Sequence, residues 1–154
     1  MKNENVKVNE TVTEAVEVKD GNVNVEEVVE DVKLPIYVER TAVRSNGKKL
    51  YNYVVNGKMN GRLIKADLIA TDLGGYEILD IAFGSESKML LGIERAVRTD
   101  ALGKAVRYNS YYVEGKDEIG LTFKVGIKPR ETSDKTYLEY IIAKEQKLLE
   151  MKEN

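Results

Sequence analysis

Residues 107–115 (RYNSYYVEG) place one arginine and three tyrosines within six positions of a predicted strand. Tyr108 and Tyr112 share one face of that strand, whereas Tyr111 points the other way beside Arg107. Aromatic rings next to cations suit single-stranded nucleic acids, because bases stack on the rings and phosphates contact the cations. The spacing therefore suggests a stacking surface for a polyanion.

Tyr51 and Tyr53 share a face of another predicted strand, and cations lie in or beside the same strands. Residues 35–133 hold 16 Lys/Arg against 12 Asp/Glu, which gives this segment a net charge of +4. In the alternative interpretation, the tyrosines only pack against their cross-strand neighbours. The candidate nucleic-acid-binding residues are Lys48, Lys49, Tyr51, Tyr53, Arg62, Lys65, Arg107, Tyr108, Tyr111, Tyr112 and Lys124.

Cysteine and histidine are both absent from the 154 residues. The first absence excludes disulfides, thiolate chemistry and zinc sites built on cysteine. The second removes the usual general base near neutral pH and the commonest metal ligand. The remaining candidate nucleophiles are serines outside any G-x-S-x-G context, namely Ser85, Ser87, Ser110 and Ser133. We therefore predict no catalytic residues and expect a protein that is not an enzyme.

Four carboxylates gather around a predicted turn over residues 72–75, and carboxylate oxygens can bind Mg²⁺ or Ca²⁺. Their spacing fits no EF-hand loop, and Asp67 and Asp80 sit on predicted strands, where solvent-facing carboxylates are common. The Gly-Gly pair at 74–75 lacks the spacing of a phosphate-binding loop. The sequence therefore predicts neither a metal site nor a cofactor; the four carboxylates are Asp67, Asp72, Glu77 and Asp80.

Alternating apolar and polar residues predict seven strands from residue 36 onward. The strands cover residues 36–44, 49–55, 61–71, 76–84, 88–98, 104–114 and 121–128. A C-terminal amphipathic helix is predicted over about residues 134–151. We expect a mainly β (α+β) fold, in which a seven-stranded antiparallel meander forms a bent sheet or a partly open barrel.

The boundaries of these elements follow from turn and cap residues. The Asn-Gly pairs at 46–47 and 56–57 are interpreted as hairpin turns, since Asn-Gly readily adopts positive φ. Ser133 or Asp134 is expected to cap the helix, because a side-chain oxygen there can accept an unpaired N–H of the first turn.

Residues 1–34 differ from the rest of the chain. They carry four Lys and nine Asp/Glu, a net charge of −5, and no aromatic residue. Such a composition predicts a flexible acidic N-terminal arm, followed by a single β-rich domain over residues 35–154. The valines between residues 25 and 32 recur at helical spacing, so a short acidic helix before Pro35 is an alternative for that part.

The order of seven strands and a helix resembles the pleckstrin-homology superfold, and five strands plugged by the helix would resemble an oligonucleotide-binding barrel. We expect a non-catalytic, cytoplasmic protein without membrane insertion that binds single-stranded nucleic acid with low specificity, as a replication-accessory protein does. The acidic arm would compete for the same groove. The alternatives are a protein-binding or adaptor module, which uses sheet edges and a groove beside the helix, and a self-associating structural protein.

Overall fold

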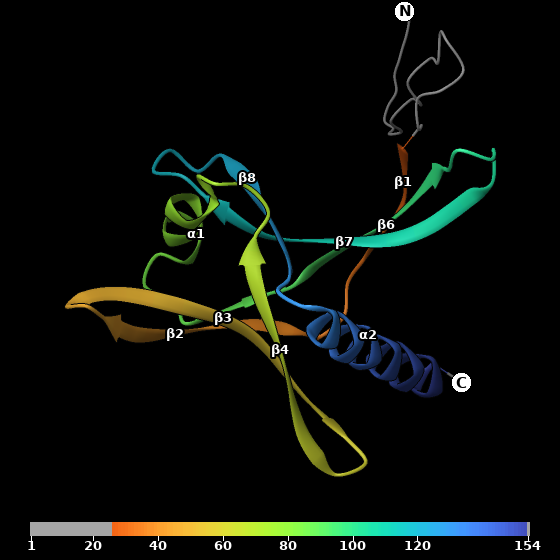
Figure 1. Ribbon diagram of the computed structural model, residues 1–154, viewed down its shortest axis with the longest axis horizontal. Helices are drawn as coiled ribbons and strands as arrows, with labels where there is room; N and C mark the ends of the chain where they lie inside the picture. Colours follow the sequence, from red (N-terminus) through yellow and green to blue (C-terminus); the bar gives the residue numbers. More distant parts are fainter. Residues whose placement is uncertain (1–25, 154) are drawn as a thin grey trace, which may run out of the picture. The chain divides into compact units, whose positions relative to one another are not determined.

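The computed structural model describes residues 26–153, and Figure 1 shows the elements that they form. The prediction of an antiparallel, mainly β protein with a C-terminal helix is confirmed. The sheet is not closed, because its strand order β1-β6-β7-β8-β4-β3-β2-β5 leaves β1 and β5 as edges. The elements are β1 (Glu26–Val32), β2 (Tyr37–Ser45), β3 (Lys48–Met59), β4 (Arg62–Ala70), α1 (Gly75–Phe83), β5 (Lys88–Leu90), β6 (Gly92–Thr99), β7 (Ala105–Lys116), β8 (Thr122–Pro129) and α2 (Thr132–Lys152).

Eight strands replace the seven predicted, and they do not form one continuous meander. The chain runs through consecutive hairpins from β2 to β4 and again from β6 to β8, but β4 then pairs with β8. The predicted strand 88–98 is divided into β5 and β6 on either side of Leu91, which is fully buried. The remaining differences are the strand β1 and the helix α1.

The predicted strand over residues 76–84 is wrong, because this segment forms α1. Leu79, Ala82 and Phe83 are buried at the i, i+3 and i+4 spacing of one helix face. Gly115 of β7 allows this face to approach the sheet, since a Cβ on Gly115 would lie 2.6 Å from the Cα of Ala82. The segment is apolar on both faces, so its alternation resembled that of a strand.

Residues 1–25 of the predicted acidic arm lie outside the described residues. Glu26–Val32 forms β1, which pairs antiparallel with β6, so the helical alternative for this part is wrong. Valine is a poor helix former and a good strand former, and β6 supplies the partner that local sequence cannot reveal.

The chain divides into two compact units. The described part of unit 1 comprises residues 26–32 and 93–110, which hold β1, β6 and the first half of β7. Arg95 of β6 lies 3.6 Å from the Glu30 carboxylate of β1. The carboxylate of Asp100 accepts the backbone N–H groups of Leu102 and Lys104, which closes the predicted turn between β6 and β7.

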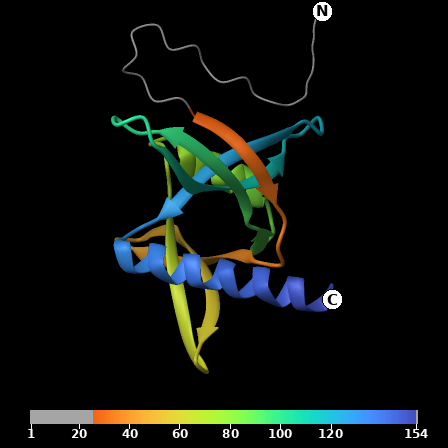
Figure 2. The ribbon, with the colours of Figure 1, turned by 90° about the vertical axis from the view of Figure 1, so that its right-hand side faces the viewer.

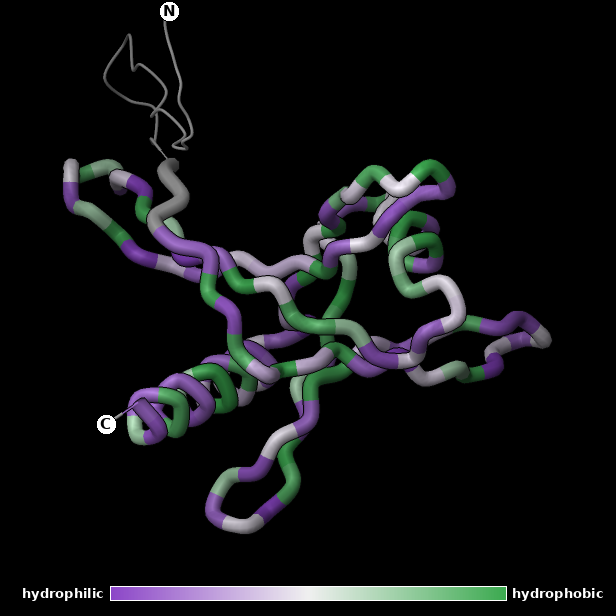
Figure 3. Tube along the Cα trace, turned by 180° about the vertical axis from the view of Figure 1, so that it is seen from behind, coloured by the Kyte–Doolittle hydropathy of each residue, from purple (hydrophilic) through white to green (hydrophobic). Residues whose placement is uncertain are grey.

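Unit 2 comprises residues 33–92 and 111–154. Its helix α2 contacts β3, β4 and β8 (Figure 2). Hydrophobic and hydrophilic residues alternate along this helix (Figure 3), and its buried positions include Leu138, Ile141 and Ile142. The helix therefore presents one apolar stripe to the sheet, as the sequence predicts.

The N-cap of α2 is Glu131, so the prediction of Ser133 or Asp134 as the N-cap is wrong. Asp134, which was an expected N-cap, is the third helical residue and completes a capping box with Glu131. The buried Asp134 carboxylate accepts the N–H of Glu131 and the N–H of Asp67, each at 3.0 Å. The same side chain thus starts the helix and joins it to β4.

Asn46 and Gly47 have positive φ at the β2–β3 turn, as predicted. The pair at 56–57 is not a turn, because both residues lie inside β3. The chain reverses instead at Asn60 and Gly61, which also have positive φ. A Cβ on Gly57 would lie 2.6 Å from Ile141 of α2, so this glycine marks a close approach of helix and strand.

Candidate functional site

The segment 40–66, which forms most of the hairpins β2–β3 and β3–β4, contains seven Lys/Arg and no Asp or Glu. Acidic residues are frequent elsewhere, with 26 in the whole chain. The carboxylates that bound the segment are Glu39 and Asp67. Its six exposed cations are Arg44, Lys48, Lys49, Lys58, Arg62 and Lys65. The two hairpins therefore concentrate positive charge in a segment that has no carboxylate of its own.

The strand register arranges part of this charge in a row with tyrosines. Arg44 pairs with Lys49, the next position on that face pairs Ala42 with Tyr51, and Arg40 pairs with Tyr53. Directly paired residues of antiparallel strands point to the same face, and so do alternate residues of each strand. One face of the β2–β3 hairpin therefore runs from exposed cations near its turn to tyrosines at its base.

Arg40 organises the base of the hairpin. Its side chain is 8% exposed, and its guanidinium carbon lies 4.2 Å from the ring centroid of Tyr51 and 4.9 Å from that of Phe83. Nη1 donates to Oδ1 of Asp80 at 3.1 Å, and Nη2 donates to the carbonyl oxygen of Gly84 at 3.0 Å. The arginine thus joins β2 to the ring of Tyr51 on β3, to Asp80 of α1 and to the C-cap residue Gly84, through planar donors that a lysine lacks.

Beside this arginine, a pocket of about 350 Å³ opens against the same tyrosines; we call it the tyrosine pocket. Tyr53 forms its buried wall and Tyr76 of α1 is 45% exposed, with 6.2 Å between the two ring centroids. Cations and a carboxylate surround the rings. The lining consists of Val43, Lys49, Leu50, Tyr51, Asn52, Tyr53, Leu68, Tyr76, Asp80 and Arg130.

An unpaired stretch of β3 also borders the pocket. β4 pairs with β3 from Tyr53 onward, so among residues 26–153 the strand β2 is the only hydrogen-bonded neighbour of residues 48–52. At the end of β4, the backbone groups of Asp67 and Thr71 bond to the β8 segment. The backbone groups of Leu68, between them, therefore point to β3, where Leu68 pairs with Tyr53. By the same alternation, the backbone N–H and C=O groups of Lys49 and Tyr51 point away from β2. They give the pocket donors and acceptors that do not depend on a side chain.

The hydroxyl of Tyr53 has a raised pKa. Burial is the main cause, and the negative charge of Asp80 adds to it. The positive charge of Arg40 and its hydrogen bond to the tyrosine act in the opposite direction. The pKa stays above its ordinary value of 10.0, so Tyr53 is neutral at physiological pH.

The structure brings together only some of the residues chosen from the sequence. Lys49, Tyr51 and Tyr53 line the tyrosine pocket, and Lys48 lies beside them at the hairpin turn. Arg62 and Lys65 are exposed on the β3–β4 hairpin. Tyr53 offers little surface for stacking, because it is 3% exposed.

The remaining candidates lie on β7 and β8. Tyr111 and Tyr112 are buried, and the Nζ of Lys124 lies 4.5 Å from the ring centroid of Tyr112. These two rings pack within unit 2, as the alternative interpretation of the tyrosines expects. Arg107 and Tyr108 belong to unit 1, where the guanidinium carbon of Arg98 lies 5.5 Å from the Tyr108 ring centroid.

Sequence reasoning missed four residues of the site, namely Arg40, Tyr76, Asp80 and Arg130. Tyr76 and Asp80 were missed because α1 was predicted as a strand. A signal for the hairpins was present in the sequence: no carboxylate occurs between residues 39 and 67. The register of β2, β3 and β4 is needed to see that these cations lie on neighbouring strands.

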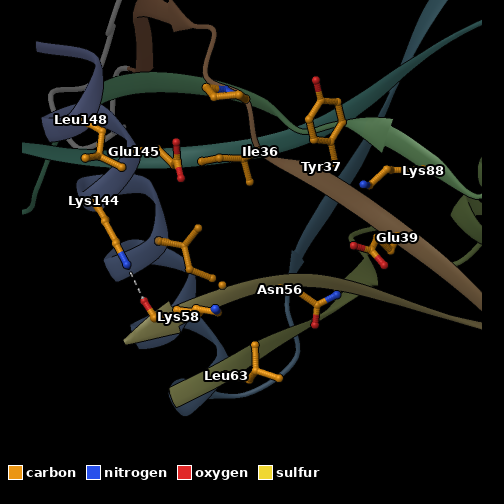
Figure 4. Close-up of a pocket in the computed structure, with 13 residues that line it drawn as sticks. Ile36, Tyr37, Glu39, Asn56, Lys58, Leu63, Lys88, Lys144, Glu145 and Leu148 are labelled. Atoms are coloured by element: carbon orange, nitrogen blue, oxygen red, sulfur yellow. Dashed lines mark hydrogen bonds between the residues drawn. The ribbon is translucent and has the colours of Figure 1, made fainter. Parts of the chain in front are cut away.

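A second pocket, of about 480 Å³, lies between α2 and the sheet; we call it the helix-side pocket. Figure 4 shows Ile36, Tyr37 and Leu63 on its sheet side and Leu148 on α2. The Nζ of Lys144 donates to the carbonyl oxygen of Lys58 at 3.1 Å across it (Figure 4). The pocket lies beside the helix, between α2 and the sheet.

Among the described residues, no group of three or more acidic, cysteine or histidine side chains is placed to hold a metal ion. Neither α1 nor α2 has the length and apolar character needed to cross a membrane. Comparison with protein families, curated proteins and solved structures gives no match to this chain.

Proposed function

We propose that the protein binds single-stranded nucleic acid without catalysing a reaction, using the β2–β3 hairpin and the tyrosine pocket. The single observation that carries the proposal is the carboxylate-free segment 40–66, whose exposed cations lead to a tyrosine-lined pocket. A cationic track with aromatic side chains is the arrangement that single-stranded nucleic acid requires, since phosphates and bases are both exposed along the strand.

In this proposal, cationic side chains contact the phosphates and an aromatic side chain stacks on a base. Arg44 and Lys49 share one face of the hairpin and contact successive phosphates, while Lys48 adds positive charge at the turn. Arg130 contacts a phosphate or a base edge from its own position in the lining. One base enters the pocket against the exposed face of Tyr76, where stacking contributes roughly 1–3 kcal/mol. The side chain of Arg40 is only 8% exposed, and its guanidinium donates to Asp80 and Gly84. It positions Tyr51 and leaves recognition to the exposed cations.

The free edge of β3 supports binding of many sequences. Each base carries neighbouring donors and acceptors on its Watson–Crick edge, and the backbone N–H and C=O groups of Lys49 and Tyr51 can pair with them in several ways. Contacts to phosphate carry no sequence information. Both features favour a sequence-tolerant surface.

The test is fluorescence anisotropy of labelled oligo-dT with the full-length protein and with two tyrosine variants. Tyr76→Ala removes the exposed ring of the tyrosine pocket, and we expect it to weaken binding about tenfold, within the range of one lost stack. Tyr37→Ala is the matched control, because Tyr37 is 43% exposed but lines the helix-side pocket. Equal affinity of both variants, or no binding by the unaltered protein, would contradict the proposal.

Protein binding is a second candidate function, and the helix-side pocket favours it. Its apolar residues Leu63 and Leu148 are exposed, at 79% and 42%, although both border a concave surface. A partner seated there would depend on these apolar anchors and little on salt. Sedimentation velocity over a range of concentrations tests the simplest case, a second copy of the chain, and Leu63→Ser would abolish any concentration-dependent increase in mass.

A further inference from the structure

Among the described residues that line the tyrosine pocket, Asp80 is the only one with a carboxylate. Its Oδ1 accepts Nη1 of Arg40 at 3.1 Å, yet its side chain remains 57% exposed. Within residues 26–153, Oδ2 has no hydrogen-bond partner. An ionised carboxylate accepts hydrogen bonds and cannot donate them. The ion pair with Arg40 therefore fixes a carboxylate whose second oxygen is available to a ligand.

A carboxylate beside a stacked base discriminates among the bases by their donors. The Watson–Crick edge of guanine presents two adjacent donors, N1–H and the N2 amino group, which one carboxylate can accept together. Thymine and uracil place a single N–H between two carbonyl oxygens, which a carboxylate repels. Adenine and cytosine present one amino group next to a ring nitrogen acceptor. Guanine is thus the base that satisfies Asp80 best.

The adjoining Hoogsteen edge of guanine fits the cationic part of the same lining. O6 and N7 are acceptors that arginine commonly contacts with two donors. Arg130 lines the pocket and is exposed, and its side chain has no hydrogen-bond partner within the described chain. The pocket therefore offers an acceptor to one edge of guanine and a donor to the other, with Tyr76 for the ring face.

We propose that the tyrosine pocket selects guanine, with Asp80 accepting from N1–H and the N2 amino group; this rests on the proposed binding of single-stranded nucleic acid. The preference applies to one nucleotide position on a surface that otherwise tolerates any sequence. Asp80 is a specificity-determining residue that is held in place by Arg40.

The test uses the unaltered full-length protein and one short labelled oligo-dT whose central thymine is replaced in turn by dG, deoxyinosine, dA or dC. We expect dG to bind about tenfold more tightly than dT, since a good two-donor contact discriminates by about that factor. Deoxyinosine keeps N1–H and O6 but lacks the N2 amino group, so its affinity should fall between those of dG and dT. Since only the ligand changes, protein stability does not enter this comparison.

Asp80→Asn provides the second measurement. The amide oxygen can still accept from Arg40, while the amide nitrogen donates to bases that present acceptors. We expect the dG preference to disappear, so that the affinities for dG and dT become equal in this variant. Equal affinities for dG, deoxyinosine and dT, with binding retained, would overturn the guanine proposal and leave the proposed function intact. Loss of binding for every oligonucleotide would overturn both.

Discussion

At the scale of single residues, Tyr53 and Arg40 are buried and hold the shape of the site, and they offer little surface to a ligand. The ring of Tyr53 is buried between Phe83 and Tyr76, with centroids 5.5 Å and 6.2 Å away. The guanidinium of Arg40 is covered on one side by Tyr51 and bonded on its edges. Ligand affinity therefore depends on neighbours that these two residues hold in place.

The raised pKa of Tyr53 leads to a prediction on stability. Its folded-state pKa lies above the unfolded value near 10.0, so the stabilisation is fully present below that pH. Above that pH, the Tyr53 hydroxyl ionises in the unfolded chain before it ionises in the folded protein. The unfolding free energy therefore decreases until the pH reaches the folded-state pKa. Tyr53→Phe removes this contribution, because phenylalanine does not titrate.

Urea unfolding of both proteins, repeated from neutral pH to about pH 11, measures the effect. The difference in unfolding free energy between wild type and Tyr53→Phe should shrink as the pH rises above the ordinary tyrosine range. Lysines and the other tyrosines titrate in both proteins, so the difference isolates Tyr53. A difference that stays constant across the whole range would show that Tyr53 has an ordinary pKa.

Residue types alone predicted part of the site, but they did not show which of the predicted tyrosines are buried. Lys49, Tyr51 and Tyr53 were chosen from the sequence, and they do lie in one pocket. The sequence could not reveal that Tyr112 is buried, because its ring occupies the space beside Gly92, where a Cβ would lie 2.3 Å from a ring carbon. Such a fit between distant segments has no local pattern.

At the scale of elements, α1 completes the site because it brings Tyr76 and Asp80 to the base of the β2–β3 hairpin. The helix has nine residues, and its buried face rests on β8 and on the second half of β7. An isolated helix this short is unstable in water, so its existence depends on this packing. Local propensity therefore could not distinguish it from a strand.

Gly115→Ala tests this dependence. The added Cβ would lie 2.6 Å from the backbone Cα of Ala82 and 3.0 Å from the ring of Phe123, and a backbone atom cannot rotate away. We expect the substitution to lower the unfolding free energy by about 1–3 kcal/mol, as overpacking of a core does. It should also weaken oligonucleotide binding, because α1 carries Tyr76 and Asp80.

Lys116→Ala is the control on the neighbouring, exposed position of the same strand. Its unfolding free energy should change by less than about 0.5 kcal/mol, as at most surface positions. Chemical denaturation of the three proteins makes the comparison. If Gly115→Ala were as stable as Lys116→Ala, α1 would not rest on β7 as described.

The predicted strands were correct where apolar and polar residues alternate on one buried face. In β4, Ala66, Leu68 and Ala70 are buried as the alternation indicated. The pattern failed where pairing is long-range, as for β1 with β6, or where a second Asn-Gly pair lies within a strand. In both cases a contact distant in sequence decides the local structure.

At the scale of the whole molecule, charge is distributed very unevenly along the sequence. Residues 1–34 carry a net charge of −5, while residues 40–66 carry seven cations and no carboxylate. The total is only −2, so the net charge of the chain hides the cationic segment. Local charge, and not the overall balance, decides where a polyanion can bind.

The most direct test of the central claim is the salt dependence of oligo-dT binding by two full-length variants of equal net charge. One variant replaces the hairpin cations Arg44, Lys48 and Lys49 with glutamine. The other replaces three exposed lysines of α2, namely Lys135, Lys147 and Lys152. Anisotropy titrations over a range of salt concentrations give the slope of log Kd against log salt for each variant.

We predict that the hairpin variant binds at least tenfold more weakly at low salt and that its slope falls by about 2, since each lost phosphate contact removes roughly 0.7. The α2 variant should bind as the unaltered protein does. If the two variants behaved alike, net charge and not the β2–β3 hairpin would govern binding, and the proposed interface would be wrong.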